Sequence, residues 1–211
     1  AKKSILSALS GYFGNAGKKI IIEEFLEGEE ASFFLICDGK KFVPFSNAQD
    51  YKKLYEKNVG PNTGGMGAYS PTKIITKELH LKIINRIIKP TIKGLNKLNI
   101  QFTGFLYAGL MITKSGPKLI EYNVRLGDPE CQVLLDRLES DFLDLCINAS
   151  NGNINNKMVS FNDKSSLCVV MTSNGYPKKY DTNILINGLE NFAKQSECTL
   201  LHAGTKYNKD G

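Results

Sequence analysis

The chain of 211 residues has no tryptophan, only two histidines, and no long apolar run. Its longest apolar run, FLYAGLMI at residues 105–112, is far too short to cross a bilayer. Neither histidine has serine and aspartate spaced around it as a nucleophilic triad would need, so both are interpreted as structural residues. We therefore expect no membrane partner and no catalysis that depends on histidine.

Cysteine is present, but not in the pattern of a disulfide framework or a zinc site. The five cysteines are odd in number, form no Cys-x-x-Cys pair and lie mostly in apolar runs. This usage predicts a reducing, cytoplasmic location. The formal charge is +6, but the lysines are spread along the sequence rather than gathered in one block. A dispersed excess is typical of a solvated surface, so no nucleic-acid partner is expected.

Both ends of the sequence have features of an internal piece of a longer protein. Residues 2–10 have helical spacing, but neither a methionine nor a capping residue precedes them. The last residues, KYNKDG, end on Asp-Gly, a strong turn signal with no strand after it. We therefore expect the chain to be part of a longer protein.

Strand and helix patterns alternate between those ends. Strands are predicted at residues 18–26, and hairpins at 30–46 and 102–126, with turns at Asp38-Gly39 and Ser115-Gly116. Helices are predicted at residues 76–89, which Pro90 would kink or end, and at 129–150, which Asp128 and Pro129 would open. Later β-rich segments are predicted at 165–177 and 198–205.

Hairpins interleaved with helices predict the fold class. We expect an α+β (α/β-type) architecture, with a largely antiparallel sheet and flanking helices. The domain boundary is placed near residue 160, with a main domain at 1–160 and the start of a small β-rich C-terminal domain at 161–211.

The strand sequence LIEYNVRL, at residues 119–126, predicts a metal and phosphate site. Alternation along a strand places Glu121, Asn123 and Arg125 on one face. A carboxylate and an amide oxygen are hard ligands, and Mg²⁺ commonly takes one or two such protein ligands beside phosphates and water. Arg125 would clamp a phosphate, and the helix start at residues 127–130 would direct free amides at the same region. The alternative is a sheet face that lies in water.

The glycine-rich stretch GPNTGGMGAYSP, at residues 60–71, has two interpretations. Its glycines permit positive φ or close backbone approach, and successive amides could line an anion site. The alternative is a mobile connector. Flexible linkers rarely contain residues such as Met66 and Tyr69, so the anion site is the preferred interpretation.

Six segments occur in the order expected of the phosphoribosylamine–glycine ligase family of the ATP-grasp superfamily: IIIEEFLEGEEASF, AQDYKK, GPNTGGMGAYSP, FTGFLYAGLMI, IEYNVRLGDPE and HAGT. The chain resembles this family over nearly its whole length. The resemblance implies the later part of an ATP-grasp region followed by the start of the C-terminal domain. It implies that the N-terminal domain, the glycine-rich lid and the nucleotide-binding lysine are missing, so the isolated chain is expected to be inactive.

The resemblance also implies a reaction. ATP would phosphorylate the carboxylate of glycine, and the amine of 5-phosphoribosylamine would attack the glycyl phosphate. The products would be glycinamide ribonucleotide, ADP and phosphate, in the second step of purine biosynthesis. The implied cofactors are ATP and Mg²⁺ or Mn²⁺, and a cytoplasmic monomer is expected. The alternatives are another ATP-grasp carboxylate–amine ligase and a non-catalytic nucleotide-binding fragment.

Site residues follow from the same resemblance. The metal ligands are Glu121 and Asn123, and Arg125 is the catalytic residue at the transferring phosphoryl group. The residues expected to bind adenine and ribose are Glu23, Glu24, Phe25, Leu26 and Glu30. Those predicted for the substrate side are Asp50, Lys52, Asn62, Thr63, Gly64, Gly65, Met66, Asp128 and Glu130.

Two departures from the wider pattern are visible. Many ATP-grasp enzymes have an acidic metal ligand on the strand before Glu-x-Asn, but that strand has none in this chain, as in the glycine ligases. Tyr51 stands where the family usually has histidine, so no role is assigned to it.

Overall fold

A computed structural model describes residues 2–192 and 197–207 of the chain. The chain divides into two units, residues 1–170 and 171–211, and each is described by itself. Over the described ranges, no helix combines the length and apolar character that a bilayer span requires.

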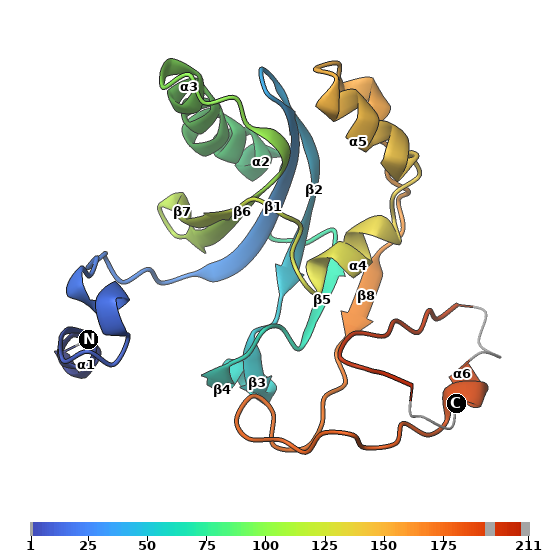
Figure 1. The fold of residues 1–211 in the computed structure, drawn as a ribbon. Helices are drawn as coiled ribbons and strands as arrows, with labels where there is room; N and C mark the ends of the chain where they lie inside the picture. Colours follow the sequence, from blue (N-terminus) through green and yellow to red (C-terminus); the bar gives the residue numbers. More distant parts are fainter. Residues whose placement is uncertain (1, 193–196, 208–211) are drawn as a thin grey trace. The chain divides into compact units, whose positions relative to one another are not determined.

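A six-stranded antiparallel sheet forms the centre of the first unit (Figure 1). The strand order is β7-β6-β1-β2-β5-β8. Their bounds are β1 (Glu29–Asp38), β2 (Phe42–Asp50), β5 (Gly67–Ser70), β6 (Thr103–Thr113), β7 (Gly116–Asn123) and β8 (Ser166–Val169). A separate two-stranded ribbon is formed by β3 (Lys53–Tyr55) and β4 (Val59–Asn62).

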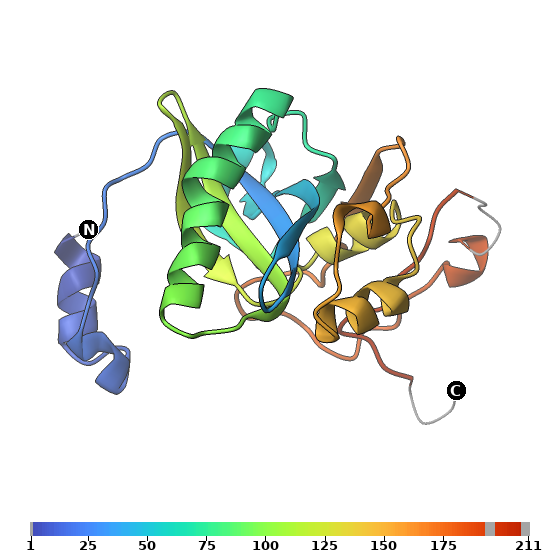
Figure 2. The same cartoon turned by 90° about the horizontal axis from the view of Figure 1, so that it is seen from above.

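Helices cover both faces of this sheet. Figure 2 shows one long helical stretch on one face and two shorter helices on the other. The long stretch consists of α2 (Lys77–Ile83), the π-helical η3 (Ile84–Ile88) and α3 (Lys89–Lys97). The opposite layer consists of α4 (Glu130–Leu135) and α5 (Phe142–Ser150). The remaining short elements of the unit are α1 (Lys2–Leu9) and the 3₁₀ helices η1 (Gly14–Lys18), η2 (Glu56–Asn58) and η4 (Asn156–Met158).

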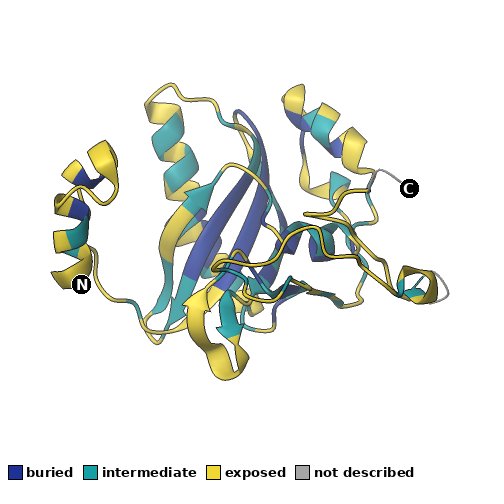
Figure 3. Ribbon diagram, turned by 60° about the horizontal axis from the view of Figure 1, so that its bottom comes forward, coloured by how far each residue is buried: buried dark blue, intermediate teal, exposed yellow. Residues whose placement is uncertain are grey.

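The central strand β1 explains why two helical layers form. Residues 31–38 are all buried, and Figure 3 shows this burial concentrated in the middle strands of the sheet. Because alternate side chains point to opposite faces, Phe33 and Leu35 pack in the cluster that contains α2 and η3. Phe34 and Ile36 pack against α4 and α5. One strand therefore contributes to two hydrophobic cores.

The two predicted hairpins are confirmed. β1 and β2 pair antiparallel across the turn at Asp38-Gly39, where Asp38 Oδ1 accepts from the amides of Lys40 and Lys41 at 3.0 and 2.7 Å. β6 and β7 pair antiparallel with Thr113 opposite Gly116, so their turn is Lys114-Ser115, one residue before the predicted position. The antiparallel sheet with flanking helices agrees with the predicted α+β class.

Two predicted elements are wrong. Residues 18–26 form no strand, and Ile21 and Phe25 are 88% and 89% exposed, since no strand in the described residues pairs with them. The second predicted helix is interrupted after Leu135, and a new helix begins with Asp141 as its side-chain cap. The first predicted helix is present, but Pro90 does not end it: a π-helical turn, η3, precedes Pro90 and the helix continues to Lys97.

The second unit has little regular structure. Its one helix in the described residues is α6 (Leu189–Phe192), and residues 171–192 and 197–207 contain no strand. Of the β-rich segment expected at 165–177, only β8 (Ser166–Val169) forms, and it pairs within the first unit. The segment expected at 198–205 contains no strand. The domain boundary near residue 160 stays a prediction.

Candidate active site

Five of the predicted site residues line one cleft of about 220 Å³. The cleft is lined by residues on or next to β1, β2, β6 and β7. Its polar lining residues are Glu30, Ser32, Asp50, Lys52, Asn62, Tyr107 and Glu121. These residues are far apart in the sequence, and the sheet order brings them together.

Glu121 and Asn123 lie on the same face at the end of β7. Asn123 Nδ2 donates to Glu121 Oε1 at 3.2 Å, so the two side chains are direct neighbours. Their partners across the sheet are Gly109 and Tyr107 on β6. Tyr122, between them in the sequence, faces the other way and contacts Thr91 Oγ1 of α3 at 2.7 Å. The predicted alternation is therefore confirmed for these three residues.

These two side chains fit a divalent cation. A carboxylate and an adjacent amide supply two hard oxygen ligands, the number that Mg²⁺ often takes from a protein. Within the described part of the chain, no group of three or more His, Cys, Asp or Glu residues is placed to hold a metal ion. The donor set therefore suits an ion that completes its coordination with phosphate and water.

Lys52 carries the positive charge of the cleft. Its ammonium lies 3.2 Å from Glu30 Oε2. Burial lowers the pKa of Lys52, but the carboxylates of Glu30, Asp50 and Glu121 outweigh that effect, so the net direction is upward. The ammonium group therefore stays charged and partly neutralises an acidic cleft.

A buried polar network supports the floor of the cleft. Glu130, the first residue of α4, is only 2% exposed. Ser32 Oγ lies 2.9 Å from Glu130 Oε1 and 2.9 Å from the Tyr107 hydroxyl. Burial and the Glu130 carboxylate raise the pKa of Tyr107, so its hydroxyl stays protonated. Glu130 of α4 is therefore linked to Ser32 of β1 and Tyr107 of β6, two residues that line the cleft.

Ser32 and Tyr107 were not predicted as site residues. Both lie within apolar strand segments, and only strand alternation could have indicated their direction, because Ser32 shares the face of Phe34 and Tyr107 points opposite to Leu106. Their polar atoms face the same side of the sheet as Glu130, which strand alternation alone could not establish.

Asp50 is the most perturbed acid of the cleft. Burial, and next the nearby carboxylate of Glu130, raise the pKa of Asp50 to about 7. Its Oδ1 atom is buried and has no hydrogen-bond partner among the described groups. Asp50 therefore has one buried oxygen whose hydrogen-bonding capacity is not satisfied in this structure.

The glycine-rich loop is a packed structure. Gly65 has a φ of +131°, and a Cβ at this position would lie 2.5 Å from Pro129 Cδ and 3.0 Å from Asp50 Oδ1. The predictions of positive φ and close approach are confirmed here. The loop thereby fixes the end of β2 against the start of α4.

Three amides of this loop bond within the protein. The N–H groups of Thr63 and Met66 donate to the carbonyls of Lys52 and Tyr51 at 2.7 and 2.8 Å. The N–H of Gly65 donates to Thr63 Oγ1 at 3.1 Å. An anion site made from successive amides of the loop is therefore not supported by these three groups.

Arg125 does not extend the row formed by Glu121 and Asn123. β7 ends at Asn123, so strand alternation does not apply beyond it, and Arg125 Nη1 donates to the Leu126 carbonyl at 2.9 Å. Arg125 is exposed and is not part of the cleft lining. Asp128 is also exposed, and its Oδ1 accepts from Gln132 at 2.8 Å.

The predicted adenine-binding segment is extended rather than a paired strand. Glu23, Glu24 and Phe25 are exposed, and Leu26 is half-buried. Glu24 forms an ion pair with Lys118, which links this segment to β7. Its backbone groups form no sheet in the described residues, so its predicted role stays a prediction.

Comparison with known proteins agrees with this geometry. The family model of the phosphoribosylglycinamide synthetase ATP-grasp (A) domain matches residues 1–131. Phosphoribosylamine–glycine ligase of Vigna unguiculata is 48% identical over 215 residues, which cover 100% of this chain and 69% of that protein. The Brucella melitensis ligase is 46% identical over 211 residues, which cover 100% of this chain and 49% of that protein.

A solved structure shows the same fold. The crystal structure of the Thermotoga maritima ligase matches with a TM-score of 0.72 and 32% identity, over 86% of this chain and 46% of that one. The fold is therefore that of the ATP-grasp class. Within this class, the chain belongs to the phosphoribosylamine–glycine ligase family. It spans about half the length of the Brucella and Thermotoga proteins.

The raised pKa of Asp50 predicts how stability depends on pH. Burial and the nearby Glu130 carboxylate raise the pKa of Asp50 in the folded protein to about 7, from 3.8 for the free side chain. The unfolded chain therefore binds fewer protons between these values, and the free energy of unfolding falls as pH rises through this window. Asp50→Asn should be more stable than the wild type at pH 8, by on the order of 1 kcal/mol because solvent screens this partly exposed group, with little difference at pH 4. Urea unfolding at both pH values measures this, and an equal difference at both would contradict it.

Replacing Gly65 by alanine should destabilise the fold through a steric overlap that does not arise at Gly116, which serves as the control. Gly116 also has a positive φ, +117°, but nothing lies within 4 Å of its Cβ position. Gly116→Ala should cost roughly 1 kcal/mol from backbone strain alone, and Gly65→Ala roughly 3 kcal/mol because it also overlaps Pro129. Denaturant unfolding of both variants measures the difference. Equal costs would mean that the loop is not packed as described.

Proposed function

We propose that a protein containing this chain ligates glycine to 5-phosphoribosylamine at the expense of ATP, through a glycyl phosphate. The products are glycinamide ribonucleotide, ADP and phosphate, in the second step of purine biosynthesis. The observation that carries the proposal is the cleft that Glu121 lines together with Lys52 and Asp50, with Asn123 hydrogen-bonded to Glu121. Membership of the ligase family supports the choice of substrates.

Glu121 and Asn123 would hold Mg²⁺ or Mn²⁺ through their side-chain oxygens. The ion would supply positive charge to the phosphates of ATP, which phosphoryl transfer requires. Glu30 would accept hydrogen bonds from the ribose hydroxyls, and the backbone of Glu23, Glu24, Phe25 and Leu26 would contact adenine. Glu30 would then exchange its present ion pair with Lys52 for the ribose.

The substrates would occupy the other side of the cleft. Lys52, released from Glu30, would bind a carboxylate or phosphate, and the Asp50 carboxylate, which lines the cleft, would accept a hydrogen bond from the amine. An amine attacks an acyl phosphate as the free base, so a nearby carboxylate near its titration point can take the proton that leaves. Asn62 and Thr63 would add polar contacts, and Arg125 would need to move to reach the phosphoryl group.

Backbone positions of Gly64, Gly65 and Met66 would shape the substrate side, since Gly65 keeps the loop close to Asp50. Glu130 would act on Asp50 through its charge rather than by contact with the substrate. Asp128 would fix the start of α4 through Gln132. A monomeric cytoplasmic enzyme is part of the proposal.

Glycine-dependent ADP release tests the function. The full-length ligase that contains this chain, supplied with ATP, Mg²⁺ and phosphoribosylamine, should release ADP only when glycine is added. Release that requires bicarbonate or another carboxylate instead would assign a different ATP-grasp ligase. Nucleotide binding without any release would indicate a non-catalytic nucleotide-binding protein.

Glu121→Gln tests the metal ligand in that enzyme. The change keeps the size of the side chain and removes its charge, so activity should fall by about 100-fold or more while the fold is retained. The same change at Glu190, an exposed residue of α6, should leave activity unaltered. Circular dichroism checks folding. Near-normal activity of Glu121→Gln would remove this residue from the metal site.

A further inference from the structure

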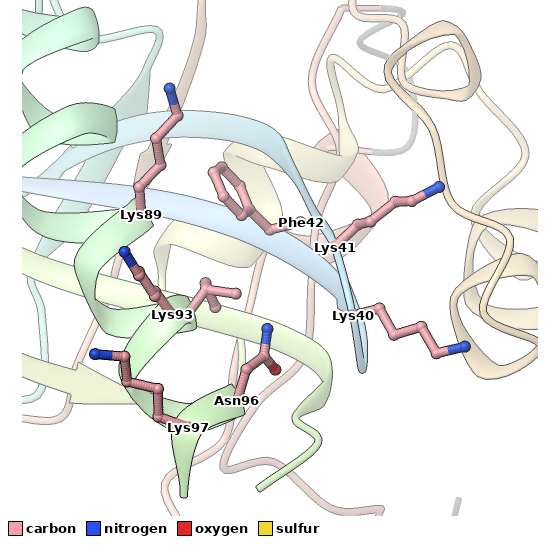
Figure 4. A pocket seen from close by; sticks show the side chains of 8 residues that line it. Lys40, Lys41, Phe42, Lys89, Lys93, Asn96 and Lys97 are labelled. Atoms are coloured by element: carbon pink, nitrogen blue, oxygen red, sulfur yellow. The ribbon is translucent and has the colours of Figure 1, made fainter. Parts of the chain in front are cut away.

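A second groove lies at the other end of β1 from the cleft. It has a volume of about 640 Å³ and is bounded by the turn between β1 and β2 on one side and by α3 on the other. Figure 4 shows lysine side chains on both sides, with the ring of Phe42 between them; Lys40 and Lys41 extend outward on one side and Lys93 and Lys97 on the other. Phe42 and Ile92 are half-buried and form its apolar floor.

Five lysines surround this groove without an acidic partner. Lys40 and Lys41 come from the turn, and Lys89, Lys93 and Lys97 follow one another at every fourth position of α3. All five are exposed, and none forms an ion pair within the described ranges 2–192 and 197–207.

Nearby acids do not offset this charge. The carboxylate of the turn belongs to Asp38, which is 6% exposed and already accepts from two backbone amides. The sequence has no Asp or Glu between Glu78 and Glu121, a stretch that includes all of α3. Like charges four residues apart on a helix repel each other, so the row on α3 does not stabilise the fold by itself.

We propose that this groove binds single-stranded nucleic acid. The lysines contact successive backbone phosphates, and a base stacks on the ring of Phe42. Asn96, which also lines the groove, offers an amide to a base edge. A positively charged groove with an aromatic platform is the usual arrangement for single-strand binding without strong sequence preference.

The geometry favours this ligand over other anions. Four residues of helix rise about 6 Å, so Lys89, Lys93 and Lys97 present charges at regular intervals along one line, as an extended phosphodiester chain does. A flat membrane surface would not reach the apolar floor between the two sides. Protein interfaces are depleted in lysine at their centres, which disfavours an acidic protein segment.

The folded chain gathers charges that the sequence disperses. Lys41 and Lys89 are far apart in the sequence, yet they line the same groove, because Phe42 and Ile92 both pack against the hydrophobic cluster beneath it. The expectation of no nucleic-acid partner rested on sequence spacing alone. The groove supplies a local density of charge that spacing cannot reveal.

Titration with a fluorescein-labelled oligouridine, followed by fluorescence anisotropy over about 50 to 200 mM salt, tests the proposal. If all five lysines contact phosphates, the slope of log K against log salt is about −3.5 for single strands. The triple variant K89Q/K93Q/K97Q keeps two lysines and should have a slope of about −1.4, with affinity at low salt reduced about tenfold or more.

Control variants distinguish binding in this groove from non-specific attraction by surface lysines. K73Q/K157Q/K179Q removes the same charge from exposed positions elsewhere and should bind as the wild type does. Phe42→Leu should weaken oligouridine binding without changing the slope of log K against log salt. It should not affect the binding of inorganic polyphosphate.

Several results would overturn the proposal. These are equal losses of oligouridine affinity in the two triple variants and an unchanged slope of log K against log salt in K89Q/K93Q/K97Q. Binding of polyphosphate or polyglutamate as tightly as oligouridine would also overturn it. Circular dichroism and thermal melting confirm that each variant is folded. No nucleotide substrate is present, so the result is independent of the ligase assay.

Discussion

The burial of β1 on both faces is the constraint from which the site follows. Because residues along this strand alternate between two hydrophobic cores, the direction of each side chain is fixed by its position. Phe34 and Ile36 face α4 and α5, and the same row continues toward the start of the strand as Ser32 and Glu30. The cleft therefore lies on the same face of β1 as the core under α4 and α5, at the start of the strand, where the side chains on that face are polar instead of apolar.

Electrostatics in the cleft favour a ligand that carries both charge signs. Glu30, Asp50 and Glu121 surround the single ammonium of Lys52, and a buried Glu130 lies behind them. Burying carboxylates without enough partners is costly, as the raised pKa of Asp50 shows. A divalent ion, a nucleotide and an amine would together satisfy these groups, which agrees with membership of the ligase family.

Local patterns predicted the hairpins, the class of fold and the pair Glu121 and Asn123, because turn residues and strand alternation act over a few neighbouring positions. The prediction of a strand at residues 18–26 was wrong because a segment with a strand pattern forms a strand only where another strand pairs with it. The predicted helix 129–150 failed because Arg137 is buried, and its guanidinium donates to the Asn162 and Lys164 carbonyls and the Ser70 hydroxyl. The network around Ser32 and the lysine groove depend on tertiary contacts, which spacing does not encode.

The central claim is that Glu121 and Asn123 bind the ion that accompanies ATP. The most direct measurement is the nuclear magnetic resonance spectrum of side-chain amides in the full-length ligase, with Mn²⁺ as a paramagnetic probe. With Mn²⁺ and ATP together, the account predicts strong broadening of the Asn123 amide signals and little effect on the distant Asn148. Sharp Asn123 signals in the presence of bound Mn²⁺ and ATP would contradict it.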